Sequence, residues 1–153
     1  MPPIRFECKK AIALTAAEIA NEIANTDRWS EFQGYGVLPG IRKAEYEKRT
    51  HTMVGSRIAV ENTDGSHHVE EILEWKPGEK ITLKLCEFSP PLNRLAAHFL
   101  EEWYFTQENN LTHVIRKFQL FPLKPYTQPF LWFISLLFRR AIRAHLDQMA
   151  RGE

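Results

Sequence analysis

Residues 129–138 read PFLWFISLLF, and the basic sequence RRAIRAHLDQMARGE follows at 139–153. Ser135 is the one polar residue in the first of these two segments. A helix that packs on a core through a single stripe needs apolar residues on that stripe alone. The first segment has more apolar surface than one stripe explains, so something must cover the rest: a curved sheet, an apolar ligand, a partner or a membrane.

This apolar run is too short to span a bilayer, which takes about 20 apolar residues, and Arg139 ends it. The amino-terminal sequence MPPIRFECKK lacks the basic region and apolar core of a signal peptide. A net charge of +1 gives no broad field for nucleic acid. We therefore expect a cytoplasmic protein with one domain over residues 1–153, in which Cys8 and Cys86 are free thiols that behave as small buried hydrophobes.

The spacing of apolar residues predicts one strand, two short helices, six further strands and a long final helix. Thr15 and Glu18 form a capping box at the start of the first helix, and we expect Asp27 to cap the second. The expected strands are residues 4–14, 42–50, 56–62, 66–75, 80–88, 97–107 and 111–120, and the last helix begins near Thr127 or Gln128. Successive hairpin-like connections imply an antiparallel sheet with helices on one face, which is an α+β fold.

The last predicted hairpin can be placed in register from its turn at Asn109 and Asn110. Side chains alternate along a strand, so the pairing decides which of them share a face. The pairs are Phe105 with Val114, Trp103 with Arg116, Glu101 with Phe118, and Phe99 with Leu120. This face is apolar apart from Glu101 and Arg116, so we expect it to be the inner face, with these two charges diagonal to each other.

Three further stretches carry a family resemblance. They are DRWSEF (27–32) followed by GYGVLPGI (34–41), IAVENTDGSHHVEEILEWKPGEKITLKL (58–85) and EEWYFTQENNLTHVIRKFQLFP (101–122). In this order they resemble the START/Bet v 1-like (SRPBCC) superfamily, particularly its polyketide cyclase/dehydrase and lipid-transport branch. The resemblance covers nearly the whole chain.

The resemblance implies a helix-grip fold: a seven-stranded curved antiparallel sheet around a long C-terminal helix, with two short helices after the first strand. It also implies a cavity for hydrophobic ligands between sheet and helix. It supplies no catalytic motif, so catalytic residues remain unassigned. Together with the inner-face register, it gives the expected ligand-binding residues: Trp29, Phe32, Phe99, Glu101, Trp103, Phe105, Arg116, Phe118, Ile134, Leu137 and Phe138.

A buried charge must be paired or neutral, so Glu101 and Arg116 have three interpretations. They form a structural ion pair, they bind the polar end of a ligand, or they act in acid–base catalysis. His67 and His68 are neighbours on a strand and point to opposite faces, so they cannot hold one ion together. We expect them to be solvated or at an edge, and we expect no metal site and no cofactor.

These features favour a protein that binds, and in doing so transports, a hydrophobic small molecule or lipid. One alternative is a cyclase or dehydratase-like enzyme acting on a polyketide-like substrate in the same cavity. Another is a module that docks on a membrane, or on a protein such as a second copy of the chain, through residues 129–138. A buried carboxylate with a raised pKa would favour the enzyme, and an exposed apolar helix face would favour docking.

Overall fold

The computed structural model describes residues 2–152, and its elements follow the predicted order. They are β1 (Ile4–Ile12), α1 (Ala16–Ala24), η1 (Thr26–Glu31), β2 (Ile41–Lys48), β3 (Arg57–Asn62), β4 (His67–Lys76), β5 (Lys80–Cys86), η2 (Leu92–Arg94), β6 (Ala96–Glu108), β7 (Leu111–Pro122), η3 (Pro125–Thr127) and α2 (Gln128–Arg151). The η elements are short 3-10 helices.

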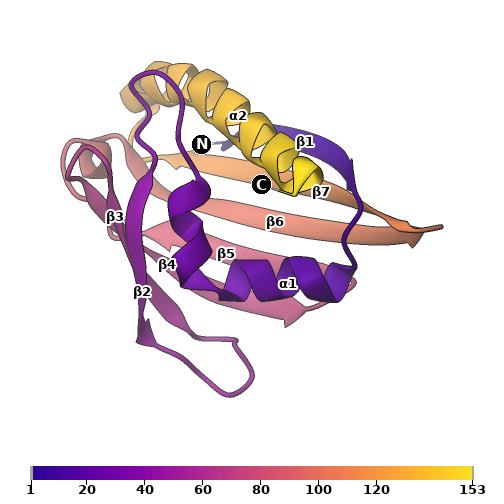
Figure 1. The fold of residues 1–153 in the computed structure, drawn as a ribbon. Helices are drawn as coiled ribbons and strands as arrows, with labels where there is room; N and C mark the ends of the chain where they lie inside the picture. The colour runs from indigo at the N-terminus through magenta and orange to yellow at the C-terminus, as the bar shows by residue number, and fades with distance from the viewer. Residues whose placement is uncertain (1, 153) are drawn as a thin grey trace.

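All seven strands form one antiparallel sheet in the order β1-β7-β6-β5-β4-β3-β2. The first two strands of the chain are therefore its two edges, and α1 with η1 makes the connection between them. The sheet curves beneath α2, and α1 and η1 lie on the same side as α2 (Figure 1). The predicted α+β helix-grip architecture is confirmed.

The predicted register of the β6–β7 hairpin is also confirmed. Asn109 takes a positive φ of 55° in the turn, and all four predicted pairs are present. Alternate residues along both strands are buried. The inner face thus carries the predicted charged pair among apolar side chains.

The predicted capping box of α1 is present. Thr15 Oγ1 accepts from the Glu18 backbone N–H at 3.1 Å, and the Thr15 N–H donates to Glu18 Oε1 at 3.2 Å. The expected cap by Asp27 is wrong, because η1 begins one residue after Asn25, and the Asn25 side chain accepts from the Asp27 N–H at 3.2 Å. The one residue between α1 and η1 ends the first helix and caps the second.

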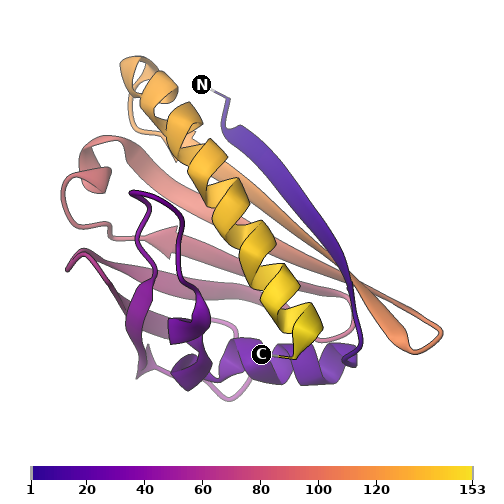
Figure 2. The ribbon, with the colours of Figure 1, turned by 45° about the horizontal axis from the view of Figure 1, so that its top comes forward.

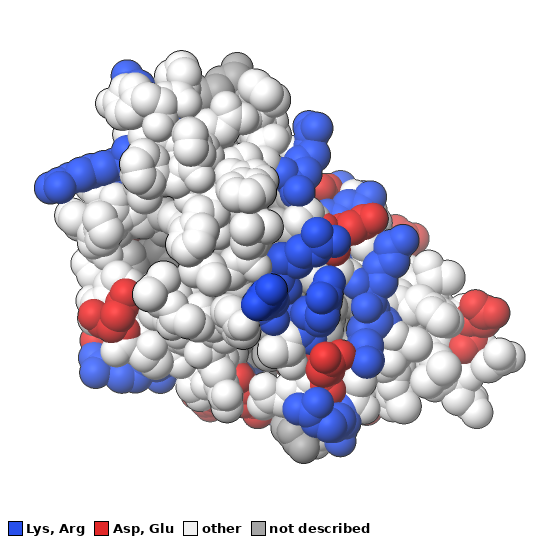
Figure 3. Space-filling model, turned by 90° about the horizontal axis from the view of Figure 1, so that it is seen from above, with Lys and Arg blue, Asp and Glu red and all other residues white. Residues whose placement is uncertain are grey.

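The helix α2 begins at Gln128, as predicted, and lies along β1 and β7 (Figure 2). Its buried stripe includes Leu131, Phe138 and Leu146, spaced by helical turns so that they share one side. The opposite side of its first half is exposed and apolar, so the sheet covers only part of the apolar surplus. Figure 3 shows a broad area with few charged side chains beside a band of Lys and Arg, which has some Asp and Glu among them.

Two of the remaining sequence expectations have simple outcomes. Cys8 is buried and Cys86 is half-buried, and both are free thiols; burial raises the pKa of each thiol. Within residues 2–152, no helix is long and apolar enough to cross a membrane.

Candidate functional site

A cavity of about 340 Å³ lies between the concave face of the sheet and α2. Its walls come from α1, η1, the connection from η1 into β2, the strands β3 to β7, the connection at residues 88–95 and the inner side of α2. Most of the wall is apolar. Val37 and Pro90 also line the cavity and are exposed, so the cavity reaches the surface between the connections that carry them.

Almost all of the residues predicted to bind a ligand line this cavity, and Phe105 is the exception. Phe105 is buried and stacks on Trp103, with ring centroids 6.2 Å apart. The cavity extends along β6 only as far as Trp103. Residue alternation identified the inner face correctly but could not show where along the strand the cavity ends, so Phe105 is a core residue.

Glu101 and Arg116 meet inside the molecule, as the register predicts. Arg116 Nε donates to Glu101 Oε2 at 2.9 Å, and Arg116 Nη2 donates to the same oxygen. Both residues are buried. Burial raises the pKa of Glu101, while the adjacent Arg116 guanidinium opposes this shift by favouring the charged carboxylate.

The Arg116 guanidinium has two further neighbours. Its Cζ lies 4.0 Å from the centre of the Trp103 ring, and its Nη1 lies 3.0 Å from Nδ1 of His145. Burial, with a smaller contribution from Arg116, lowers the pKa of His145 to about 3. A neutral His145 can accept a hydrogen bond from Arg116, so the guanidinium connects β7 to α2.

The sequence predictions missed His145, although a signal was present. His145 lies seven residues after Phe138, about two helical turns, and therefore projects from the same side of α2. Phe138 was already among the expected cavity residues. Extending its stripe by two turns would have added His145 to the set.

The Trp103 indole is the remaining polar group at this end of the cavity. Its Nε1–H is buried and makes no hydrogen bond of ordinary geometry to any residue within 2–152. It still lies close enough to the Glu101 carboxylate to favour the charged form and lower its pKa slightly. A buried donor without an acceptor costs free energy. Trp103 is one of the residues that line the cavity, so its indole lies beside the space that a bound molecule would fill.

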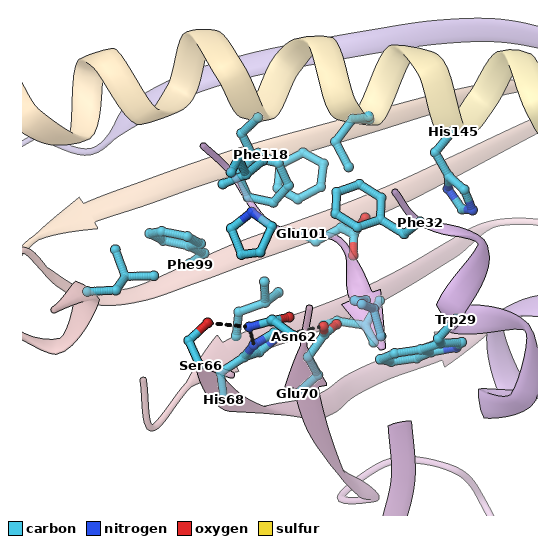
Figure 4. A pocket seen from close by; sticks show the side chains of 18 of the residues that line it. Trp29, Phe32, Asn62, Ser66, His68, Glu70, Phe99, Glu101, Phe118 and His145 are labelled. Carbon is cyan, nitrogen blue, oxygen red and sulfur yellow. Dashed lines mark hydrogen bonds and ion pairs between the residues drawn. The ribbon is translucent and has the colours of Figure 1, made fainter. Parts of the chain in front are cut away.

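A second polar cluster lines another part of the cavity (Figure 4). His68 Nε2 lies 2.9 Å from Glu70 Oε2, and Asn62 Nδ2 lies 3.4 Å from His68 Nδ1. Asn62 Nδ2 also donates to Ser66 Oγ at 3.1 Å. These side chains come from β3, β4 and the turn between them.

The expectation of a solvated or edge histidine is therefore wrong for His68. Its side chain is 10% exposed, because alternation along β4 points it inward and the Phe88 ring packs beside it at 6.0 Å. His67 is exposed, as expected. Within residues 2–152, no group of three or more His, Cys, Asp or Glu side chains is arranged to hold a metal ion.

The rim loop, residues 33–40, forms one side of the cavity mouth. Tyr35 and Leu38 exchange two backbone hydrogen bonds of 2.9 Å, so the loop ends in a tight turn that presents Val37 to solvent. At its base, Gly34 has a φ of +73°, and a Cβ there would lie 2.3 Å from the Leu38 carbonyl oxygen. A Cβ on Gly40 would lie 2.6 Å from the Phe32 carbonyl oxygen, so only glycine fits at either position.

Chemically, this is a mostly apolar cavity with two separate polar clusters and one unpartnered donor. Such a site can bury the apolar body of a small molecule and fix its orientation through a few polar contacts. No model of a protein family matches the sequence, and no curated protein matches it either.

Solved structures do match. The Zhui aromatase/cyclase from Streptomyces sp. R1128 aligns with a TM-score of 0.74 at 12% identity, covering 98% of this chain and 93% of that one. The ginseng major latex-like protein 151 from Panax ginseng aligns with a TM-score of 0.61 at 18% identity, covering 95% and 98%. Ara h 8.0201 aligns with a TM-score of 0.62 at 11% identity, covering 94% and 97%. With its curved seven-stranded sheet around α2, this chain therefore has the same helix-grip fold as these three proteins.

Proposed function

We propose that this protein binds a hydrophobic small molecule or lipid in the cavity, with a polar atom of the ligand at the Trp103 indole. The observation that carries the proposal is a buried, unpartnered Trp103 N–H in the wall of a mostly apolar cavity. A volume of about 340 Å³ is at the lower end of the range typical of small-molecule sites. The ligand supplies the missing acceptor while its apolar body fills the rest.

The charges around Trp103 indicate whether the polar atom of the ligand is charged or neutral. Glu101 already balances the Arg116 guanidinium, and His145 is neutral. A ligand carboxylate would add a second negative charge beside Glu101 in a buried site, which is costly. A neutral acceptor such as a carbonyl, ester or hydroxyl oxygen fits better than a free acid.

The experiment is native mass spectrometry of the purified protein, followed by extraction of any ligand that co-purifies. In parallel, an uncharged fluorescent apolar probe such as a naphthalene ketone is titrated into the protein. Phe118→Ala removes a large ring from the cavity wall. This change enlarges the cavity and should alter the affinity of the protein for the probe. Leu73→Ala is the control, because Leu73 is exposed and does not line the cavity. The absence of both a co-purifying ligand and saturable probe binding would overturn the proposal.

A second candidate function is supported by the polar clusters. His68 and Glu70 form a hydrogen-bonded acid–base pair in the cavity wall, and burial raises the pKa of Glu101. These are the groups that a cyclase or dehydratase-like reaction would use for proton transfer. One of the structures with the same fold is named an aromatase/cyclase.

An assay for substrate turnover distinguishes the two candidate functions, the binding protein and the enzyme. A linear poly-β-ketone analogue is incubated with the protein, with His68→Gln and with Glu70→Gln. The enzyme would be favoured if the unmodified chain converts the analogue and both variants lose this activity while they still bind the probe. Binding without turnover would favour the binding protein. Ligand transport and a cytoplasmic location remain predictions.

A further inference from the structure

The outward side of α2 is apolar in its first half. Trp132 is 57% exposed, Phe133 54% and Phe130 59%. Three more exposed side chains extend this surface, which we call the apolar face: Leu136, Tyr126 just before the helix, and Val37 on the rim loop. Single exposed apolar residues are ordinary, but a contiguous patch marks an interaction site. Figure 3 shows a broad area without charged side chains on this side of the molecule, beside a band of Lys and Arg.

The second half of the same helix is basic. Arg139, Arg140 and Arg143 are all exposed and follow the apolar face along the helix. No acidic residue occurs in the sequence between Glu108 and Asp147. Arg140 Nη1 donates to the Tyr35 hydroxyl at 2.8 Å, which holds this guanidinium beside the rim loop. The face is therefore apolar at one end and positively charged at the other.

We propose that the apolar face and these three arginines dock on the surface of an anionic lipid bilayer, with α2 lying in the plane of the interface. An amphipathic helix with large apolar residues on one part of its surface and arginines beside them has the chemistry of an interfacial helix. Trp and Tyr are the side chains that prefer the headgroup region, and the arginines match anionic headgroups.

A second copy of the chain fits this surface less well. In a two-fold symmetric dimer the same patch lies on both sides of the interface. The helix stretch from Gln128 to Leu146 contains no carboxylate, and the next one, Asp147, already pairs with Lys10 at 2.9 Å. A dimer through this stretch would therefore leave the arginines without opposite charges. A bilayer containing anionic lipids supplies those charges.

The cavity mouth adjoins the docking surface. Ile134 and Leu137 line the cavity from α2, and Val37 belongs both to the cavity wall and to the apolar face. A docked molecule would thus place the mouth against the lipid, and an apolar ligand could enter without crossing water. This ligand step rests on the proposed function, whereas the docking itself does not.

The experiment is co-sedimentation of the ligand-free chain with vesicles of phosphatidylcholine alone and of an equal mixture of phosphatidylcholine and phosphatidylserine. Binding to the mixed vesicles and its loss at high salt are expected. Trp132→Ser with Phe133→Ser should abolish binding. Arg139→Gln with Arg143→Gln should weaken binding to the mixed vesicles by roughly thirtyfold.

The control is Leu73→Ser, which alters an exposed leucine of β4 that lies outside the apolar face and the cavity; it should bind the mixed vesicles like the unmodified chain. Thermal unfolding verifies that every variant is folded. The proposal is overturned if the unmodified chain binds neither vesicle, or if the Trp132 and Phe133 changes leave binding intact. It is also overturned if light scattering shows a dimer that these changes dissolve.

The apolar probe separates this proposal from the proposed function. If the Trp132 and Phe133 variant takes up the probe in solution but does not bind vesicles, the docking proposal is supported and the cavity is unaffected. If the unmodified chain binds vesicles but never the probe, docking stands and the ligand-binding proposal fails.

Discussion

Arg116 on β7 and His145 on α2 lie in direct contact, with 3.0 Å between Nη1 and Nδ1. The contact pairs a permanent cation with an imidazole that burial keeps neutral. Protonation of His145 would place two positive charges side by side and remove the acceptor for Arg116. This relationship makes His145 a source of pH-dependent stability.

The first prediction concerns that dependence. The pKa of His145 falls from 6.5 to about 3 on folding, so between these values the unfolded chain binds a proton there and the folded chain does not. The contribution of His145 to the unfolding free energy is fully present above pH 6.5. It declines as the pH falls below this value, by up to about 1.4 kcal/mol per pH unit. His145→Asn keeps a hydrogen-bond acceptor but cannot titrate. As the pH is lowered, the unfolding free energy of this variant should therefore decrease less steeply than that of the unmodified chain.

Urea unfolding of both proteins at a series of pH values from neutral to mildly acidic provides the measurement. Other groups, including Glu101, titrate in both proteins, so the difference between the two slopes reports position 145. Parallel pH profiles would show that the pKa of His145 is the same in the folded and the unfolded chain, and would overturn the prediction.

The second prediction tests the buried ion pair. Arg116→Met leaves Glu101 buried without its partner, which typically costs about 3–5 kcal/mol, while replacing both residues with apolar ones can cost far less. Glu101→Leu combined with Arg116→Met should therefore be more stable than Arg116→Met alone, as measured by urea unfolding. A single variant as stable as the double would mean that the pair is not held as a buried ion pair.

The same double variant tests whether the pair also acts on the ligand. If it folds and binds the apolar probe with unchanged affinity, Glu101 and Arg116 are structural only. If it folds and loses the probe, the pair helps to bind the polar end of the ligand.

The third prediction concerns Trp103. Trp103→Phe keeps an aromatic ring against Arg116 but removes the indole N–H. It should weaken binding of a ketone probe about threefold to tenfold, the usual net value of one neutral hydrogen bond, and should leave a matched hydrocarbon probe nearly unaffected. Equal losses for the two probes would mean that packing, rather than the N–H donor, determines affinity at this position.

The fourth prediction concerns the start of α1. Thr15→Ala removes the oxygen that accepts from the Glu18 N–H and should lower the unfolding free energy by about 1 kcal/mol. Thr15→Ser keeps the oxygen and is the control, with a midpoint in urea close to that of the unmodified chain. An unchanged midpoint for the alanine variant would show that the cap adds no stability.

The features that were predicted correctly depend on local sequence. Asn109 and Asn110 set the turn of the last hairpin, and alternation then places Glu101 and Arg116 on the same face. The capping box at Thr15 needs only four consecutive residues. In each case the deciding atoms are near one another in the chain.

The errors concern features that depend on distant parts of the chain. Alternation along β4 gives the side to which His68 points, but its burial also depends on the Phe88 ring, which comes from the connection after β5 and packs beside it. Phe105 has the right alternation but lies beyond the end of the cavity. The low pKa of His145 requires both burial by the sheet and the proximity of Arg116. The shape of the cavity, rather than the pattern of any one strand, determines these properties.

The two glycines at the base of the rim loop make that loop a convenient place for engineering. Replacement of Gly34 or Gly40 would push the neighbouring backbone apart. Gly36 has space for a Cβ but takes a φ of +59°, which favours glycine. Val37, which is 82% exposed, is therefore the position at the tip that tolerates change. The turn can therefore be varied or lengthened at its tip while its glycine base is kept. A library restricted to the tip would change the cavity entrance and leave the buried polar groups untouched, so it could alter which molecules enter without altering how they are held.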